Sequence, residues 1–164
     1  MDVQRVGVVG LGAMGAGIAQ VAAEAGFEVV GREVTAELGE AAAGRIAHFL
    51  TRKVEKGQYT EEERNAAVAR LETTTELAAL AECDLVIEAI VEELGAKREL
   101  FAELERTCRP DAVLATNTSA LSVTEIAAVT SSPERVVGMH FFNPAPLMPL
   151  VEVVRAERSS DEAV

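Results

Sequence analysis

Short apolar runs recur along the chain and are separated by segments with helical spacing. Residues 6–9 are apolar and β-branched and precede a glycine, which is the pattern of a strand buried in a parallel sheet. The same kind of run predicts further strands at 27–30, 85–90, 113–116, 136–141 and 150–154.

Helical patterns occupy most of the intervals between these runs. Unbroken helical composition or an apolar stripe predicts long helices at 14–25, 36–56 and 93–107. Thr60 with Glu63 forms a capping box that opens a further helix to about residue 71. Ser122 with Glu125 opens a short helix, and Asp161 resembles the start of another.

This alternation of strand and helix determines the predicted fold class. It indicates one α/β domain, residues 1–164, with a Rossmann-type doubly wound sheet that is mostly parallel and has helices on both faces. We expect the strand at 150–154 to lie antiparallel at the edge of the sheet. Around residues 57–75 two helices follow one another, which predicts a projecting helical hairpin.

Composition limits the kinds of binding partner and the cellular location that we expect for this protein. The formal net charge of −12 argues against nucleic acid and against anionic membrane surfaces. No apolar run is long enough to span a bilayer. Cys83 and Cys108 are too few for a disulfide framework and too far apart for a metal pair. We therefore expect no metal and a reduced, cytoplasmic location.

The loop after the first predicted strand has the pattern GxGxxG. Because it lies between a strand and a helix, its glycines would allow a tight turn, close approach of a pyrophosphate, and packing of helix on strand. The helix N-terminus would add free N–H groups for the phosphates. Glycines in ordinary turns are the alternative. The predicted cofactor-binding residues of this loop are Gly10, Leu11, Gly12, Ala13, Met14 and Gly15.

Glu33 follows the end of the second predicted strand, roughly 20 residues beyond the glycine loop. An acid at this place in a dinucleotide-binding domain binds the adenosine ribose hydroxyls. Its charge repels a 2′-phosphate, which favours NAD over NADP. Arg32 beside it could receive that phosphate, so NADP stays open.

His140 is one of two histidines in the chain and lies near the end of the predicted strand 136–141. Ligands of open α/β sheets bind at the carboxyl ends of the strands. If strand 150–154 pairs with this one, Glu152 could reach the imidazole and fix its tautomer. Such a pair could take a proton from an alcohol while hydride leaves to nicotinamide. A core histidine with a solvated glutamate is the alternative.

Polar residues also follow two other predicted strands. The sequence Asn-Thr-Ser at 117–119 could hydrogen-bond a substrate oxygen or form a turn into the next helix. Glu92 and Lys97 follow strand 85–90. They could contact a cofactor or form an ordinary exposed helix start.

Four segments in order resemble the NAD-binding domain of the 3-hydroxyacyl-CoA dehydrogenases: GLGAMG, VIEAIVEEL, TNTSALSVTEIA and GMHFFNPAPLMPLVEV. The resemblance covers nearly the whole chain and is greatest to the short bacterial 3-hydroxybutyryl-CoA dehydrogenases. It implies the NAD-dependent interconversion of (3S)-3-hydroxyacyl-CoA and 3-oxoacyl-CoA in fatty acid metabolism.

By position, the resemblance implies roles for single residues. His140 matches the catalytic histidine, Glu152 the acid paired with it, and Ser119 a serine near substrate and nicotinamide. The other matches are cofactor contacts, namely Glu33, Glu92, Lys97, Ser119 and Asn143.

The resemblance also implies a place for coenzyme A, at the helical hairpin after residue 35. The family uses a serine and a lysine there. Lys53 or Lys56 could be the lysine, whereas His48 and Phe49 occupy the neighbourhood of the serine. The family continues into a helical domain that closes over the acyl group, supplies a further catalytic asparagine and forms a homodimer. That domain is absent from this chain, so we expect residues 1–164 to bind NAD with little or no turnover.

Two other functions stay open. GLGAMG also suits β-hydroxyacid dehydrogenases of the 3-hydroxyisobutyrate type, which lack HFFNP and use a lysine far downstream. The second alternative is a non-catalytic NAD-binding protein, similar to the lens crystallins that resemble this family. The presence of both His140 and Glu152 argues against it.

Overall fold

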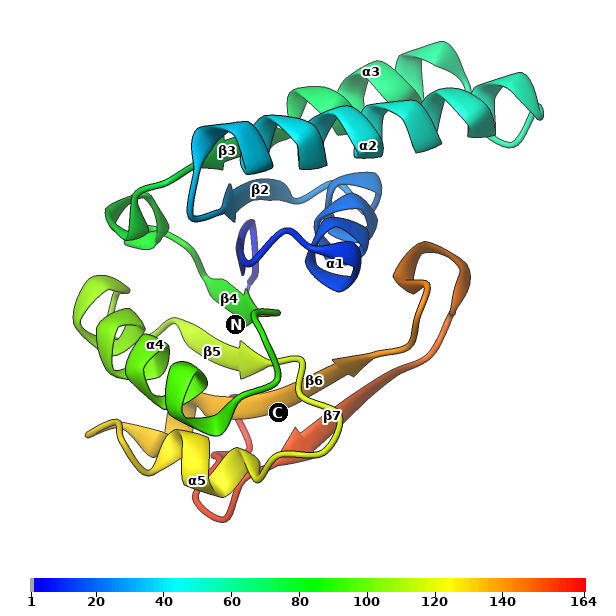
Figure 1. The fold of residues 1–164 in the computed structure, drawn as a ribbon. Helices are drawn as coiled ribbons and strands as arrows, with labels where there is room; N and C mark the ends of the chain where they lie inside the picture. Colours follow the sequence, from blue (N-terminus) through cyan, green and yellow to red (C-terminus); the bar gives the residue numbers. More distant parts are fainter. Residues whose placement is uncertain (1) are drawn as a thin grey trace.

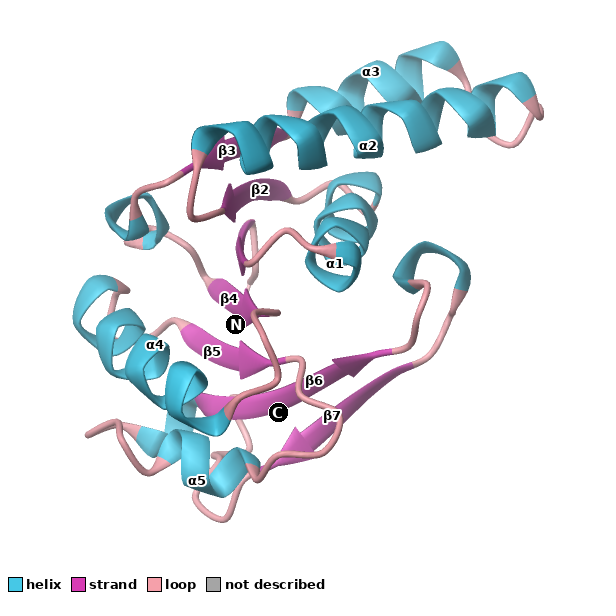
Figure 2. Cartoon of the chain, viewed as in Figure 1, coloured by secondary structure: helices cyan, strands magenta, loops and turns pink. Residues whose placement is uncertain are grey.

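A single sheet organises the protein, and helices cover both of its faces (Figure 1 and Figure 2). The computed structural model describes residues 2–164. The sheet has seven strands in the order β3-β2-β1-β4-β5-β6-β7, all parallel except β7, which is antiparallel to β6. The strands are β1 (Arg5–Val9), β2 (Glu28–Arg32), β3 (Leu71–Thr74), β4 (Leu85–Glu88), β5 (Val113–Thr116), β6 (Val136–Phe141) and β7 (Val151–Arg155). The predicted Rossmann-type fold and its antiparallel edge strand are therefore confirmed.

The helices fall into two groups that cover opposite faces of the sheet (Figure 2). They are α1 (Ala13–Glu24), α2 (Ala36–Glu55), α3 (Glu61–Ala69), α4 (Leu94–Thr107) and α5 (Val123–Ala127). Buried side chains of α1, α2 and α3, such as Ile18 and Ile46, belong to one apolar cluster. Those of α4 and α5, such as Phe101 and Ile126, belong to the other. Neighbouring residues of β1 alternate between the clusters, because successive side chains of a strand point to opposite faces.

Two elements differ from the sequence predictions. The predicted helix that starts at Thr60 ends at Ala69, and the next residues form β3, where Leu71 pairs with Val29 of β2. The sequence LETT of β3 lacks an apolar run because this strand lies at the sheet edge and is only partly buried. The residues from Asp161 form a turn instead of a helix, and Asp161 makes an ion pair with Arg155 at 2.7 Å.

The predicted helical hairpin is formed by α2 and α3, which pack against each other and against α1 (Figure 1). Gly57 ends α2 with a φ of 68°, a value that favours glycine. The predicted capping box at Thr60 and Glu63 is present at the start of α3. Phe49 of α2 is apolar but 55% exposed.

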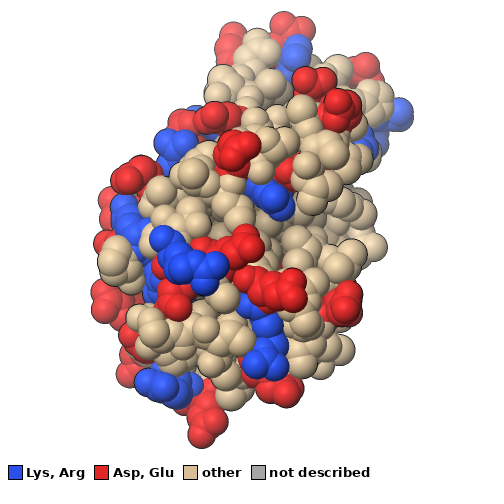
Figure 3. Space-filling view, turned by 60° about the vertical axis from the view of Figure 1, so that its left-hand side comes forward, with Lys and Arg blue, Asp and Glu red and all other residues tan. Residues whose placement is uncertain are grey.

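The remaining features concern the surface and the cysteines. No helix within residues 2–164 combines the length and apolar composition that crossing a bilayer requires. Acidic and basic side chains are interspersed on the face drawn in Figure 3. Cys83 and Cys108 are both buried, and burial raises the pKa of the Cys108 thiol to about 11. In the described part of the chain, no group of three or more His, Cys, Asp or Glu side chains is arranged to hold a metal ion.

Candidate active site

The glycine loop joins β1 to α1 through one unusual turn and one very close contact. Gly10 has a φ of 86°, a conformation that side chains disfavour, and its N–H donates to the carbonyl of Arg32. A Cβ on Gly15 would lie 1.7 Å from the carbonyl oxygen of Gly10. A Cβ on Gly12 would meet nothing within 4 Å. Gly12 also begins α1 without a side-chain cap, so the first N–H groups of this helix are available to an anion.

Glu33 links the end of β2 to the glycine loop. Its Oε2 accepts the N–H of Leu11 at 2.9 Å, and its Oε1 accepts the N–H of Val34 at 2.7 Å. The neighbouring Arg32 donates from Nε to the carbonyl of Thr75 at 3.2 Å. The carboxylate therefore lies next to the loop, while the guanidinium is held toward the segment after β3.

His140 and Glu152 form a pair across strands β6 and β7. They are direct partners in the antiparallel register, and Nδ1 of His140 lies 2.9 Å from Oε2 of Glu152. The His140 side chain is 22% exposed, and its ring centroid lies 4.7 Å from that of Phe142. The ring is thus packed on one side and held at Nδ1, while part of it remains accessible.

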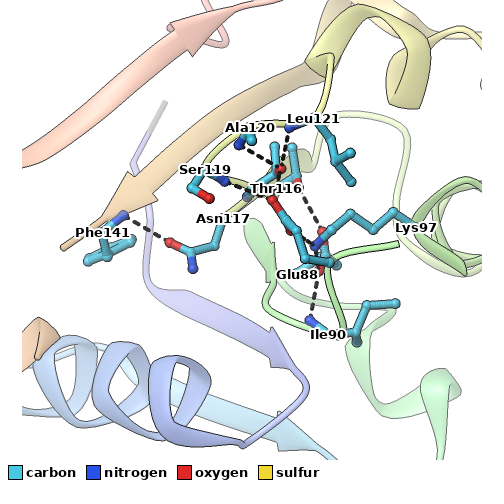
Figure 4. Close-up of polar contacts among 11 residues, drawn as sticks. Glu88, Ile90, Lys97, Thr116, Asn117, Ser119, Ala120, Leu121 and Phe141 are labelled. Carbon is cyan, nitrogen blue, oxygen red and sulfur yellow. Dashed lines mark hydrogen bonds and ion pairs between the residues drawn. The ribbon is translucent and has the colours of Figure 1, made fainter. Parts of the chain in front are cut away.

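A buried ion pair lies beside the ends of β4 and β5 (Figure 4). Lys97 of α4 is 1% exposed, and its Nζ lies 2.5 Å from Oε1 of Glu88, which is 0% exposed. The same oxygen accepts the N–H of Ile90 at 2.7 Å, and Oε2 accepts the hydroxyl of Thr116 at 2.7 Å. A buried carboxylate is tolerated when it is paired and hydrogen-bonded in this way.

Glu92 extends this arrangement into a closed loop of contacts. Its Oε2 lies 3.2 Å from Nζ of Lys97, and its Oε1 accepts the hydroxyl of Thr118 and, at 3.0 Å, the N–H of Ser119. The N–H of Thr118 donates to Oγ1 of Thr116 at 3.3 Å. We name the five side chains of this loop the polar ring: Glu88, Glu92, Lys97, Thr116 and Thr118.

The environment of Glu92 keeps it ionised. Burial by itself would raise the pKa of Glu92, but the hydrogen bonds from Thr118 and Ser119 and the charge of Lys97 outweigh this effect. The pKa therefore lies below its ordinary value of 4.5. A negative charge is present at this edge of the sheet at neutral pH.

Asn117 connects the end of β5 to the end of β6. Its N–H donates to the carbonyl of Glu88 at 2.8 Å, and its side-chain oxygen accepts the N–H of Phe141 at 2.9 Å. Phe141 follows His140 directly, so the Asn117 side chain connects the loop after β5 to the strand that carries the histidine.

The contact between Asn117 and Phe141 was not predicted from the sequence, and neither were the roles of Glu88 and Thr116. Glu88 gave one signal, since it is a carboxylate that ends an apolar strand.

A groove of about 650 Å³ lies between α1, α2 and the loop after β6. Lys53 is engaged at its wall, with Nζ 2.6 Å from Glu24 and 4.7 Å from the ring centroid of Tyr59. Lys56 makes no ion pair or side-chain hydrogen bond with any of residues 2–164. The lining includes four basic side chains, the exposed ring of Phe49 and part of the proline-rich loop: Arg45, Arg52, Lys53, Lys56, Phe49, Asn143, Pro144 and Pro146.

Comparison with known proteins decides the family. A family profile described as the NAD binding domain of 3-hydroxyacyl-CoA dehydrogenase matches residues 5–164. The chain belongs to the 3-hydroxyacyl-CoA dehydrogenase family. The probable 3-hydroxybutyryl-CoA dehydrogenase of Bacillus subtilis (strain 168) is 48% identical over 162 residues, which are 99% of this chain and 56% of that protein. The 3-hydroxybutyryl-CoA dehydrogenase of Mycobacterium tuberculosis (strain ATCC 25618 / H37Rv) is 52% identical over 154 residues, 93% of this chain and 54% of that protein.

Solved structures of this dehydrogenase family agree with the fold. The 3-hydroxybutyryl-CoA dehydrogenase of Escherichia coli K12 superposes with a TM-score of 0.98 at 47% identity, over 99% of this chain and 34% of that one. The (S)-3-hydroxybutyryl-CoA dehydrogenase of Ralstonia eutropha has a TM-score of 0.96 at 37% identity, over 99% and 57% of the two chains. The predicted family resemblance is confirmed, and the chain spans about half the length of the sequence relatives it matches.

The 3-hydroxyacyl-CoA dehydrogenase domain is NAD-binding, and its glycine loop fits this cofactor. The space beside Gly12 is open, the start of α1 is uncapped, and the carboxylate of Glu33 lies beside the glycine loop. Arg32, which left NADP open, is engaged by the Thr75 carbonyl. Further contacts with the cofactor stay predictions for Glu92, Lys97, Ser119 and Asn143.

Proposed function

We propose that the protein interconverts (3S)-3-hydroxyacyl-CoA and 3-oxoacyl-CoA with NAD, and that 3-hydroxybutyryl-CoA is the preferred substrate. The observation that carries this proposal is the His140–Glu152 pair at the edge of an NAD-binding sheet. The names of the most similar relatives support the acyl-CoA. The family match argues against a β-hydroxyacid dehydrogenase of the 3-hydroxyisobutyrate type.

His140 would act as the general base for oxidation and the general acid for reduction. Glu152 accepts a hydrogen bond only, so Nδ1 of His140 donates to it and Nε2 carries the lone pair. Nε2 would take the proton of the 3-hydroxyl group, and the Glu152 carboxylate would stabilise the imidazolium that forms. Bound NAD would accept the hydride that leaves the third carbon of the substrate.

The remaining residues would bind and orient the two ligands. The glycine loop and Glu33 would hold the pyrophosphate and the adenosine ribose. Ser119, exposed after β5, would hydrogen-bond near the substrate oxygen and the nicotinamide. We also assign cofactor contacts to Glu92 and Asn143, as the family positions imply. Lys97 is buried beside Glu88 and Glu92, so we assign it an indirect role through Glu92.

Coenzyme A would bind in the groove between α1, α2 and the proline-rich loop. Basic side chains line it although the whole chain carries a charge of −12, which suits the phosphates of coenzyme A. Of the two predicted lysines, the geometry favours Lys56, because Lys53 is occupied by Glu24 and Tyr59. The exposed ring of Phe49, in place of the expected serine, offers an apolar surface for the adenine base.

Activity measurements test this proposal. A chimera in which residues 1–164 replace the matching segment of the Bacillus subtilis relative should oxidise 3-hydroxybutyryl-CoA with NAD. The same alcohol without coenzyme A should be a poor substrate. Residues 1–164 alone should bind NAD with little turnover, because the resemblance assigns closure over the acyl group to a helical domain that follows the NAD-binding domain. An inactive but folded and NAD-binding chimera would favour the non-catalytic binding protein. A homodimer is a further proposal drawn from the resemblance, and a cytoplasmic location is one drawn from the two unpaired cysteines.

A further inference from the structure

The polar ring combines full burial at one end with exposure at the other. Glu88 and Lys97 are enclosed, whereas Glu92 is partly exposed and Ser119, which Glu92 holds, is exposed. The register of β4 and β5 places Glu88 beside Thr116, and α4 brings Lys97 back to the same point. The ring therefore ties α4 through side chains to the ends of two paired strands.

Stability alone does not explain why these polar side chains are buried together. Enclosing a Glu–Lys pair costs much of what the pair gains, and apolar side chains of similar volume are often as stabilising. The pair is fully satisfied, since Glu88 accepts from Lys97, Thr116 and Ile90. Buried networks of this kind restrict geometry more than they add stability.

The geometry that the ring restricts is that of the loop after β5. Oε1 of Glu92 accepts the N–H of Ser119, and Oγ1 of Thr118 accepts the N–H of Leu121 at 2.9 Å. The loop follows β5, in the half of the sheet that takes the second mononucleotide of a dinucleotide. Glu33 and the glycine loop lie in the other half of the sheet, at β1 and β2, which takes the first mononucleotide.

We propose that the polar ring is a positioning device for the nicotinamide half of NAD, with Thr118 as the residue that locks Glu92 to the Ser119 loop. The ring acts through Glu92 and Ser119, and Thr118 itself remains buried. The inference rests on the proposed function in assigning nicotinamide to this edge. It adds to that function the residues that set the orientation of the loop.

Replacement of Thr118 tests the proposal with little disturbance of volume. Thr118→Val keeps the branched shape but removes the hydroxyl that donates to Glu92 and accepts from Leu121. Thr118→Ser keeps the hydroxyl. Thr107→Val makes the same chemical change on an exposed turn of α4, where the hydroxyl donates only to the Glu103 carbonyl. Calorimetry measures the affinity of residues 1–164 for NADH and for ADP-ribose. Thermal unfolding of each variant measures its stability.

Thr118→Val should weaken NADH binding about tenfold, the effect of one lost hydrogen bond to a charged group. ADP-ribose lacks nicotinamide, so its affinity should change less than about twofold. Thr118→Ser should restore NADH affinity to within about threefold, and Thr107→Val should leave both ligands unaffected.

Three outcomes would overturn the positioning role. Equal weakening of NADH and ADP-ribose would indicate a general structural effect, as would loss of thermal stability with unchanged affinities. Failure of Thr118→Ser to restore NADH affinity would show that the hydroxyl is not responsible. A wild-type chain that binds ADP-ribose but not NADH would instead overturn the proposed function, because nicotinamide would then have no place at this edge.

Discussion

His140 and Glu152 are direct partners in the antiparallel register of β6 and β7, and Nδ1 of the imidazole lies 2.9 Å from the carboxylate. The strand pairing fixes the two Cα positions, so the ring is held by the sheet and not by a flexible loop. This relationship gives the histidine a defined tautomer before any ligand binds. The loss of either side chain should therefore affect chemistry more than binding.

Substitution of the pair should separate the two roles. In the chimera, His140→Gln should lower kcat by about 10²–10⁴-fold, the usual contribution of a general base, with the Kd for NAD unchanged. Glu152→Gln should lower kcat by about 10²-fold, since glutamine can orient the ring but carries no charge to stabilise the imidazolium. Steady-state kinetics and NAD titrations measure these effects. Unchanged kcat in His140→Gln would rule out the assigned base.

Two glycines of the same loop should respond in opposite ways to alanine. Gly15→Ala places a Cβ 1.7 Å from the Gly10 carbonyl oxygen, so it should cost about 2–3 kcal/mol of stability as an overpacked contact. Gly12→Ala meets open space, so stability should change by less than about 0.5 kcal/mol. The same Cβ would occupy the space of the pyrophosphate, so NAD affinity should fall about tenfold or more. Urea unfolding and calorimetry provide the two readouts. Unaltered NAD affinity in Gly12→Ala would contradict the assigned phosphate site.

The two lysines of the groove should differ in their effect on the acyl-CoA. Lys56→Ala should raise the KM for 3-hydroxybutyryl-CoA in the chimera about tenfold, as expected for loss of one charge-assisted contact with a phosphate. Lys53→Ala should change it by less than about threefold, because Lys53 already pairs with Glu24. The KM for NAD serves as the internal control in both variants. The reverse order of effects would assign coenzyme A to Lys53.

Asp84 should make stability depend on pH in the acidic range. Burial by itself would raise its pKa, but the N–H groups of Arg5 and Gln4 and the charge of Arg109 outweigh this and hold the pKa below its ordinary value of 3.8. A lowered pKa in the folded state means that the ionised form stabilises the fold. That stability is fully present above the unfolded pKa and is lost as pH falls through the folded one.

Asp84→Asn should therefore destabilise the protein by about 1–3 kcal/mol at pH 7, because the buried N–H groups lose a charged acceptor. The difference between variant and wild type should shrink steadily below pH 4 as the wild-type carboxyl becomes protonated. Urea unfolding at a series of pH values measures this difference in the free energy of unfolding. Asp161→Asn, at the exposed ion pair with Arg155, is the matched control and should show little effect at any pH. A difference for Asp84→Asn that stays constant down to pH 2 would exclude ionisation as its cause.

The order of strands and helices could be predicted because strands buried on both faces must be continuously apolar. Residues 6–9 and 113–115 show this pattern, and the structure has strands there. β3 was missed because an edge strand buries little and leaves no such run in LETT. Residues 161–163 form a turn at the helix signal of Asp161, since four residues are too few to complete a hydrogen-bonded α-helix.

The sequence by itself determined the fold class, the glycine loop and the placing of His140 and Glu33 at strand ends. These features depend on residues that are close in the chain. Only the tertiary structure decided that His140 meets Glu152, that Lys53 pairs with Glu24, and that the polar ring closes. Each of these contacts joins separate elements through sheet register and helix packing. Register and packing follow from the burial of the whole apolar surface, so local patterns made the meeting of His140 and Glu152 conditional on strand pairing and gave no indication of the polar ring.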